Sequence, residues 1–161
     1  MPKITTFLTY NNQAEDAARF YTSIFPKSKI HKVTKYLEGT PMPAGTVMTV
    51  EFTLDGEEYV ALNGGPSFKF TEAVSLYVDC KNQEEIDHYW EALSAGGEEI
   101  MCGWLRDKFG MYWQVDSHRV TELMADSDRE KAQRAFNAMM KMKKIVIADM
   151  ENAAEGAAAR H

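Results

Sequence analysis

"KNQEEIDHYWEALSA" (81–95) decides the fold, because an earlier stretch, "NNQAEDAARFYTSIF" (11–25), follows the same plan. In each, an asparagine precedes a glutamate by three residues, Asn12 before Glu15 and Asn82 before Glu85, which is the spacing of a helix capping box. Apolar residues then recur at i, i+3, i+4 and i+7. These are Ala17, Phe20, Tyr21 and Ile24 in the first stretch and Ile86, Tyr89, Trp90 and Leu93 in the second. The pattern predicts two equivalent helices and an internal duplication.

Strand-like runs flank both helices in the same order. One run precedes each helix, at 4–10 and at 73–80. The runs that follow are 28–37, 46–54 and 58–63 in the first half, and 98–107 and 111–117 in the second. Asp55-Gly56, between the last two runs of the first half, is a strong hairpin signal. The order is β-α-β-β-β twice, with the second copy trimmed.

These observations predict an α+β fold of paired βαβββ modules followed by C-terminal helices. The expected boundaries are 1–63 for the first module, 64–73 for a Gly- and Pro-containing linker, 74–118 for the second module and 119–161 for a helical tail, together forming one domain. The tail is predicted to be helical throughout, with Ser127 and Glu130 as a further capping box. Its mostly apolar stripe is Ala132, Ala135, Phe136, Met139, Met140 and Lys143.

Composition narrows the possible partners. The formal net charge is −6, so a basic footprint for nucleic acid is absent and no nucleic-acid partner is expected. No apolar run approaches the roughly 20 residues that cross a bilayer, which predicts no membrane partner. The two cysteines, Cys80 and Cys102, are not paired by spacing, and reduced thiols in a cytoplasmic protein are expected.

Strand alternation predicts which residues share a face. In 46–54, an apolar face (Met48, Val50, Phe52 and Leu54) opposes a mixed one (Val47, Thr49, Glu51 and Thr53). The other mixed faces are Tyr59, Ala61 and Asn63, then Ser75, Tyr77 and Asp79, and finally Tyr112, Gln114 and Asp116. Such faces are either exposed to solvent or line a pocket with apolar walls and a few placed polar groups.

Four stretches carry a family resemblance: "ALNGGPSFKFTEAVSLYVDC" (61–80), "QEEIDHYWEALSAGGEE" (83–99), "CGWLRDKFGMYWQV" (102–115) and "REKAQRAFNAMMKMKKI" (129–145). Together with the doubled layout they resemble the vicinal oxygen chelate superfamily, which includes glyoxalase I, extradiol dioxygenases and bleomycin-resistance proteins. More narrowly they are similar to its PhnB-like branch, whose members are often labelled demethylubiquinone methyltransferase-like. The likeness runs from about Lys3 to Ala148.

The resemblance implies a cleft formed by the paired modules, a homodimer, and, in metal-dependent members, His and Glu ligands on the first and last strand of each module. Carried onto this chain, those ligand positions fall on Gln114, Ser75, Ala61 and either Thr5 or Thr6. Divalent ions want several anionic or imidazole donors, and these residues offer neutral groups or none. The histidines His31, His88, His118 and His161 have no ligand spacing. No metal and no cofactor are therefore expected.

Several functional hypotheses remain open at this point. The first is a metal-free pocket for a small organic ligand, with or without turnover. Glu51 would be its catalytic proton acceptor, and the substrate-binding residues would be Asn63, Ser75, Tyr77, Trp104, Tyr112 and Gln114. The second is a metal-dependent lyase, isomerase or dioxygenase in which a one-residue shift of register brings Glu51 or His31 into the site.

The remaining hypotheses are a methyltransferase and a purely structural dimer module. Methyltransferases of the common kind place a Gly-rich strand-to-helix turn against their cofactor. Here Gly64-Gly65 is followed by Pro66, and no G-x-G-x-G turn exists in the sequence. This absence disfavours the methyltransferase. The structural module differs from the first hypothesis only in lacking an occupied cleft.

Overall fold

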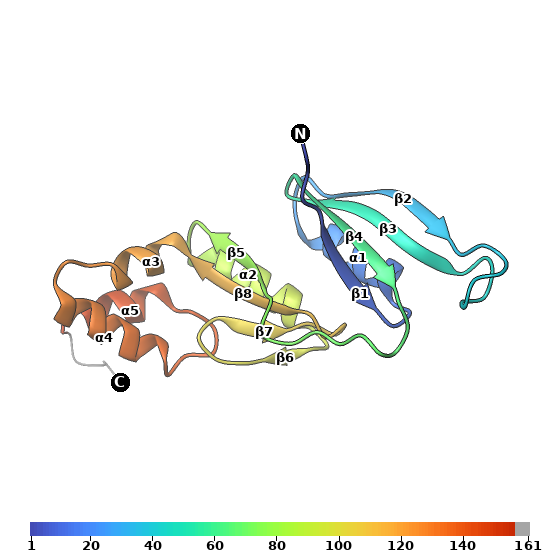
Figure 1. Ribbon diagram of the computed structural model, residues 1–161. Helices are drawn as coiled ribbons and strands as arrows, with labels where there is room; N and C mark the ends of the chain where they lie inside the picture. The colour runs from blue at the N-terminus through green and yellow to red at the C-terminus, as the bar shows by residue number, and fades with distance from the viewer. Residues whose placement is uncertain (157–161) are drawn as a thin grey trace. The chain divides into compact units, whose positions relative to one another are not determined.

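The computed structural model describes residues 1–156 and divides into two compact units, Met1–Lys69 and the part of the chain from Phe70 onward (Figure 1). The first unit contains β1 (Thr6–Tyr10), α1 (Ala14–Ile24), β2 (Lys29–Lys35), β3 (Val47–Leu54) and β4 (Glu57–Asn63). Its strands form one sheet in the order β1-β4-β3-β2. β1 and β4 are parallel, and the other neighbours are antiparallel.

The second unit repeats this plan. Its module contains β5 (Leu76–Cys80), α2 (Gln83–Ser94), β6 (Glu98–Glu99), β7 (Trp104–Arg106) and β8 (Tyr112–Ser117), with the strand order β5-β8-β7-β6. β5 and β8 are parallel, like β1 and β4. The structure therefore confirms the α+β fold of paired βαβββ modules. The trimmed part of the second copy is β6, which has only two residues.

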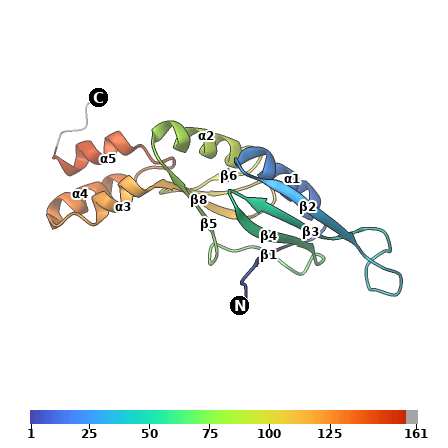
Figure 2. The same cartoon turned by 90° about the horizontal axis from the view of Figure 1, so that it is seen from above.

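Each helix covers one face of its own sheet (Figure 2). In the first unit, the side chains of Ala17, Tyr21, Val50 and Phe52 are almost completely buried. In the second, Ile86, Leu93, Leu105 and Val115 form the equivalent core. We call the face that carries no α1 or α2 the open face of each sheet.

The Asp55-Gly56 hairpin is confirmed. Leu54 pairs with Glu57, so Asp55 and Gly56 alone make the turn. Asp55 has φ 46° and Gly56 has φ 84°, the left-handed conformations of a type I′ turn. This short turn fixes the register between β3 and β4.

The two predicted helix caps differ in outcome. The Asn82 side chain accepts a hydrogen bond from Glu85 N at 3.0 Å, as predicted. The prediction of Asn12 as a cap is wrong, because α1 begins after Gln13, which makes no side-chain capping bond. Instead Asn63 Oδ1 accepts from Ala14 N at 2.9 Å. A buried amide at the end of β4 therefore satisfies the start of α1, and no local sequence pattern reveals such a long-range cap.

The turn between β7 and β8 is organised by the buried carboxylate of Asp107. Its Oδ1 accepts from Phe109 N at 2.8 Å and Met111 N at 3.0 Å, and its Oδ2 accepts from Trp113 Nε1 at 2.8 Å. Gly110, with φ 92°, lets the chain turn back toward β8. The "RDKFGMYW" stretch therefore has a structural role, which is to set the start and register of β8.

The prediction of a continuous C-terminal helix is wrong. The structure has three helices instead, α3 (His118–Met124), α4 (Arg129–Met139) and α5 (Ile147–Ala154). α4 is capped by Asp128, whose carboxylate accepts from Glu130 N and Lys131 N, and not by Ser127. Every helix in the described part of the chain is too short or too polar to span a bilayer.

The segment 140–146 breaks the helical pattern because its backbone is bonded to the second module. Met142 O accepts from Cys102 N at 2.7 Å and Lys143 O accepts from Gly103 N at 2.8 Å. The Gln83 side chain donates to Ile145 O at 2.8 Å and accepts from Ile147 N at 2.9 Å. Ile145 is fully buried. These tertiary contacts outweigh the helix propensity of "KMKKI".

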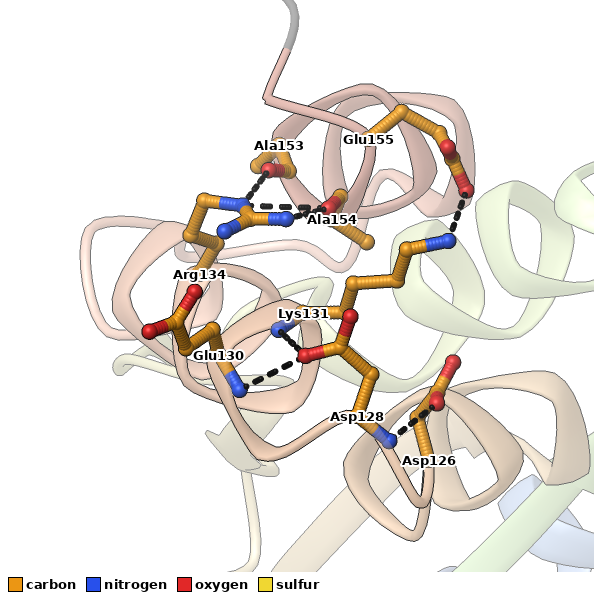
Figure 3. A network of polar contacts seen from close by, with 8 residues as sticks. All are labelled: Asp126, Asp128, Glu130, Lys131, Arg134, Ala153, Ala154 and Glu155. Atoms are coloured by element: carbon orange, nitrogen blue, oxygen red, sulfur yellow. Dashed lines mark hydrogen bonds and ion pairs between the residues drawn. The ribbon is translucent and has the colours of Figure 1, made fainter.

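α4 and α5 are held together by the polar contacts drawn in Figure 3. Arg134 donates three hydrogen bonds to the carbonyl oxygens of Ala153 and Ala154, the carbonyls at the end of α5. Lys131 pairs with Glu155 at 3.4 Å on the surface. Arg134 therefore satisfies acceptors that a helix C-terminus otherwise leaves to water.

Candidate functional site

The β8 register defines a row of side chains on the open face of the second sheet. Gln114 is the partner of Tyr77 on β5 and of Trp104 on β7. Because strand partners point to the same face, the Gln114 amide lies between two aromatic side chains. We call Tyr77, Gln114 and Trp104 the glutamine row. Tyr77 is 49% exposed and Trp104 is half-buried, so both present ring surface to solvent.

Two more of the expected binding residues lie beside this row. Ser75 Oγ accepts a hydrogen bond from Gln114 Nε2 at 2.9 Å. Tyr112, two residues before Gln114 on β8, shares its face and is only 8% exposed. Within residues 1–156, Gln114 Oε1 accepts no hydrogen bond. The structure thus brings Ser75, Tyr77, Trp104, Tyr112 and Gln114 together on one face of one sheet.

The equivalent row of the first sheet has different chemistry. Phe7 on β1 and Glu51 on β3 are the partners of Val60 on β4. Position by position, Phe7, Val60 and Glu51 correspond to Tyr77, Gln114 and Trp104. The first-module counterpart of Gln114 is therefore Val60 and not Ala61, which is fully buried on the face covered by α1. The first open face is mostly apolar at this level, and Phe7 is 57% exposed there.

The prediction that Tyr59, Ala61 and Asn63 lie on the open face of β4 is wrong. Ala61 pairs with Val50, and Tyr59 pairs with Phe52, with the two rings stacked at 5.6 Å. Tyr59, Ala61 and Asn63 therefore lie on the helix face, and Val60 and Leu62 lie on the open face. β3 and β4 are joined by two residues that both take left-handed conformations, and the resulting pairing cannot be read from the alternation of one strand alone.

This register separates two of the expected site residues. Asn63 lies on the opposite face of the sheet from Glu51, and it is 6% exposed. Its Oδ1 holds Ala14 N, and its Nδ2 donates to Val47 O at 3.0 Å. The amide of Asn63 is thus committed to the fold of the first module.

Glu51 lies on the open face of the first sheet, as alternation predicted, and it is exposed. Its neighbours in register are Lys32 on β2 and Val60 on β4. Its assignment as a catalytic proton acceptor stays a prediction. His31 lies at an irregularity of β2 and shares a hydrogen bond with Thr53.

No group of three or more His, Cys, Asp or Glu side chains within residues 1–156 has an arrangement that holds a metal ion. The two cysteines, Cys80 and Cys102, are free. Burial raises the pKa of the Cys80 thiol to about 12 and also raises the pKa of Cys102. Both thiols are therefore protonated at neutral pH and are weak nucleophiles.

The structure adds two carboxylates to the glutamine row. Asp116 on β8 and Asp79 on β5 are direct partners, and each is two residues beyond a member of the row. The pKa of Asp116 is raised to about 6, chiefly by burial and also by the charge of Asp79, while the hydrogen bond from Ser117 N acts in the opposite direction. Burial, followed by the charge of Asp116, likewise raises the pKa of the Tyr77 phenol. Alternation already assigned both carboxylates to this face, but only the β5–β8 register shows that they are adjacent.

The fold agrees with what the chain is similar to. A family model described as 3-demethylubiquinone-9 3-methyltransferase matches residues 2–116. The match includes both modules and stops before α3. The chain belongs to this family. The family match is shorter than the expected likeness, since α3, α4 and α5 lie outside it.

Solved structures also support this family and this fold. A putative 3-demethylubiquinone-9 3-methyltransferase, PhnB protein, from Bacillus cereus is 40% identical over 72% of this chain and 100% of its own, with a TM-score of 0.65. This relative supports the PhnB-like assignment. Protein PA1353 from Pseudomonas aeruginosa is 17% identical over 73% of this chain and 98% of its own, with a TM-score of 0.59, which supports the fold alone.

A glyoxylase/bleomycin resistance protein/dioxygenase domain from Frankia sp. EAN1pec is also similar, at 16% identity over 70% of this chain and 89% of its own. Its TM-score of 0.43 is too low to support an argument on its own. No curated protein matches the chain.

Proposed function

We propose that this family member binds a small organic molecule on the open face of the second sheet, with the ligand seated on the glutamine row. The observation that carries the proposal is the position of Gln114 between Tyr77 and Trp104, with one side of its amide held by Ser75. The aromatic rings provide apolar contact, and Gln114 Oε1 provides a fixed hydrogen-bond acceptor. An amide fixed between apolar walls is the usual composition of a small-molecule site.

The amide also supports binding without a metal. In metal-dependent relatives, the resemblance places a glutamate at the position of Gln114. A neutral amide and the Ser75 hydroxyl are weak ligands for a divalent ion. Elemental analysis of protein purified without an affinity tag tests this point. We expect less than about one-tenth of an equivalent of Zn, Fe, Mn or Ni, and a stoichiometric amount contradicts the metal-free site.

The family description names a methyltransferase, and the residues of this chain do not fit the usual cofactor site. The two strand-to-helix turns, 11–13 and 81–82, contain no glycine. Each module also has a mixed four-stranded sheet, whereas common S-adenosylmethionine sites lie at the ends of parallel strands in a larger α/β sheet. The proposed function is therefore binding of an organic ligand, and calorimetry with S-adenosylmethionine, for which we expect no heat of binding, tests the alternative.

Binding is tested with a fragment library followed by ligand-observed NMR. We expect hits that weaken at least about tenfold in Gln114→Leu and in Tyr77→Ala, because these variants remove the acceptor and one wall. Gln133→Leu, a similar change at an exposed amide on α4, serves as the matched control and should leave the same hits unchanged. Hits that respond equally to Gln114→Leu and Gln133→Leu contradict the proposed site.

A further inference from the structure

We propose that the ligand of the glutamine row is an organic cation, whose positive charge lies against Asp116 and Asp79 and whose apolar body lies on Tyr77 and Trp104. This inference rests on the proposed function and names its ligand class. It comes from the placement of the two carboxylates relative to the row, from the absence of a cation that balances them, and from the aromatic side chains beside them.

Each carboxylate lies two residues beyond a member of the glutamine row along its own strand, and therefore on the same face. Asp116 follows Gln114 by two residues on β8, and Asp79 follows Tyr77 by two residues on β5. Two residues of a strand span about 6.6 Å, and neighbouring strands are about 4.8 Å apart. A ligand with an ammonium group on a short apolar body can therefore contact the aromatic side chains and both carboxylates at the same time.

Neither carboxylate has a balancing charge in the described part of the chain. Asp79 Oδ1 accepts from His118 N at 2.7 Å, and Asp116 Oδ1 accepts from Ser117 N at 2.7 Å. Within residues 1–156 neither makes an ion pair with Lys, Arg or His. Surface carboxylates elsewhere do form such pairs, for example Asp87 with Lys144 at 2.8 Å.

The cationic side chains near this face are already paired. Arg106 on β7 is bound to Glu98 at 3.0 Å. On α3, which follows β8 directly, Arg119 is bound to Glu122 and Glu151, and His118 lies 3.8 Å from Glu122. The other titratable groups that act on Asp116 and its neighbours are Tyr77 and Cys80, both neutral at pH 7, and Glu85, which pairs with Lys81 at 3.8 Å. The remaining charge at this end of the face is therefore negative.

The aromatic side chains favour the same ligand class. The faces of Trp and Tyr rings attract ammonium groups, and quaternary ammonium ligands are recognised by such rings. Trp104 and Tyr77 flank Gln114, and Tyr112 lies on the other side of the row from Asp116. An anion placed here meets like charge, and a neutral ligand leaves the two carboxylates adjacent and unpaired. A cation satisfies the carboxylates and the rings together.

Three probes of similar shape and different charge test the inference: benzyltrimethylammonium, benzyl alcohol and benzoate. We expect calorimetry at pH 7.5 to show at least about tenfold tighter binding of the cation than of the other two. Cation affinity should fall about tenfold in Asp116→Asn and further in the Asp79→Asn, Asp116→Asn double variant. Asp149→Asn removes the same charge from an exposed residue of α5 and should leave the affinity unchanged.

The pH profile adds an independent readout. Cation affinity of the unmodified protein should rise between pH 5 and pH 7 as Asp116 ionises, and this rise should be absent in Asp116→Asn.

Equal or tighter binding of benzoate or benzyl alcohol overturns the inference, as does a loss in Asp149→Asn equal to that in Asp116→Asn. No binding of the cation in the millimolar range overturns it too. If the affinities of all three probes are the same in Gln114→Leu and Tyr77→Ala as in the unmodified protein, the proposed function itself fails. If the neutral probe responds to those variants and the cation is not favoured, only the inference fails.

Discussion

At the scale of the single residue, the second module depends on carboxylates in two different environments. Asp107 is buried and accepts three hydrogen bonds from the turn it organises. Asp116 is half-buried and receives one hydrogen bond while facing a second carboxylate. The first arrangement stabilises the fold, whereas the second costs stability at neutral pH, as is consistent with the binding role proposed for Asp116.

Asp107→Asn should destabilise the protein. The amide keeps one oxygen but places an NH₂ group against either Trp113 Nε1 or the backbone N–H donors, so one buried donor loses its acceptor. We expect a loss of about 2–3 kcal/mol in the free energy of unfolding, measured by urea denaturation. Asp149→Asn, at an exposed position of α5, should cost less than about 0.5 kcal/mol. Equal losses in the two variants contradict the role given to Asp107.

Asp116→Asn should have the opposite effect at neutral pH. The folded pKa of Asp116 is raised above its ordinary value of 3.8 to about 6, so the folded state binds more protons than the unfolded state between these values. The unmodified protein therefore loses stability as pH rises from about 4 to above 6. Asparagine can still accept from Ser117 N without this charge.

We expect equal stability of Asp116→Asn and the unmodified protein near pH 4. Above pH 7 the variant should be more stable by about 1 kcal/mol, after allowance for solvent screening of a half-buried group. Urea denaturation across this pH range measures the difference. A variant that is less stable at pH 7.5 than at pH 4, relative to the unmodified protein, contradicts the raised pKa of Asp116.

At the scale of elements, local patterns predicted what local interactions determine. The two helices, the Asp55-Gly56 turn and the βαβββ order follow from periodicity and turn residues, and all are present. The α1 cap and the break at 140–146 were not predicted correctly, because each depends on contacts distant in sequence. The face of β4 was also wrong, because it follows from the pairing of β4 with β3 across the Asp55-Gly56 turn. Asn63 reaches α1 across 49 residues, and Gln83 reaches Ile145 across 62.

In the candidate site, too, local patterns predicted some features, and the pairing between strands determined the others. Alternation placed Ser75 with Tyr77 on one face of their strand, and Tyr112 with Gln114 on one face of theirs, because each strand fixes its own alternation. Placing Trp104 opposite Gln114, or Asp79 beside Asp116, needs the register between strands. The β7–β8 register is set in part by Asp107, whose buried hydrogen bonds have no short-range signal beyond the "DKFG" turn itself.

The contact between α4 and α5 gives a prediction at this scale. Arg134→Met removes the donors that satisfy Ala153 O and Ala154 O, so we expect a loss of about 1–2 kcal/mol in the free energy of unfolding. Lys131→Met breaks only the exposed pair with Glu155 and should cost less than about 0.5 kcal/mol. Both contacts are visible in Figure 3, and thermal denaturation of the two variants compares them directly. A larger loss in Lys131→Met contradicts the role of Arg134.

At the scale of the whole molecule, the question is what α3, α4 and α5 contribute to a chain whose family match ends at residue 116. The Bacillus cereus relative is covered completely by 72% of this chain. In this protein, however, 140–147 is bonded to Cys102, Gly103 and Gln83 of the second module, and Ile145 is fully buried. We infer that the C-terminal segment is an integral part of the second unit.

Shortening the chain to residues 1–126 tests this. The shortened protein loses Ile145 and Met150 from its core and leaves Cys102 N and Gly103 N without their acceptors. We expect the free energy of unfolding to fall by at least about 3 kcal/mol in urea denaturation, from the apolar burial alone. Ile145→Ala in the full chain should reproduce about 2 kcal/mol or more of this loss. Leu37→Ala, at an exposed side chain, should change little. An unchanged denaturation midpoint in the shortened protein means that the C-terminal helices are only an appendage, and that the second module is stable without them.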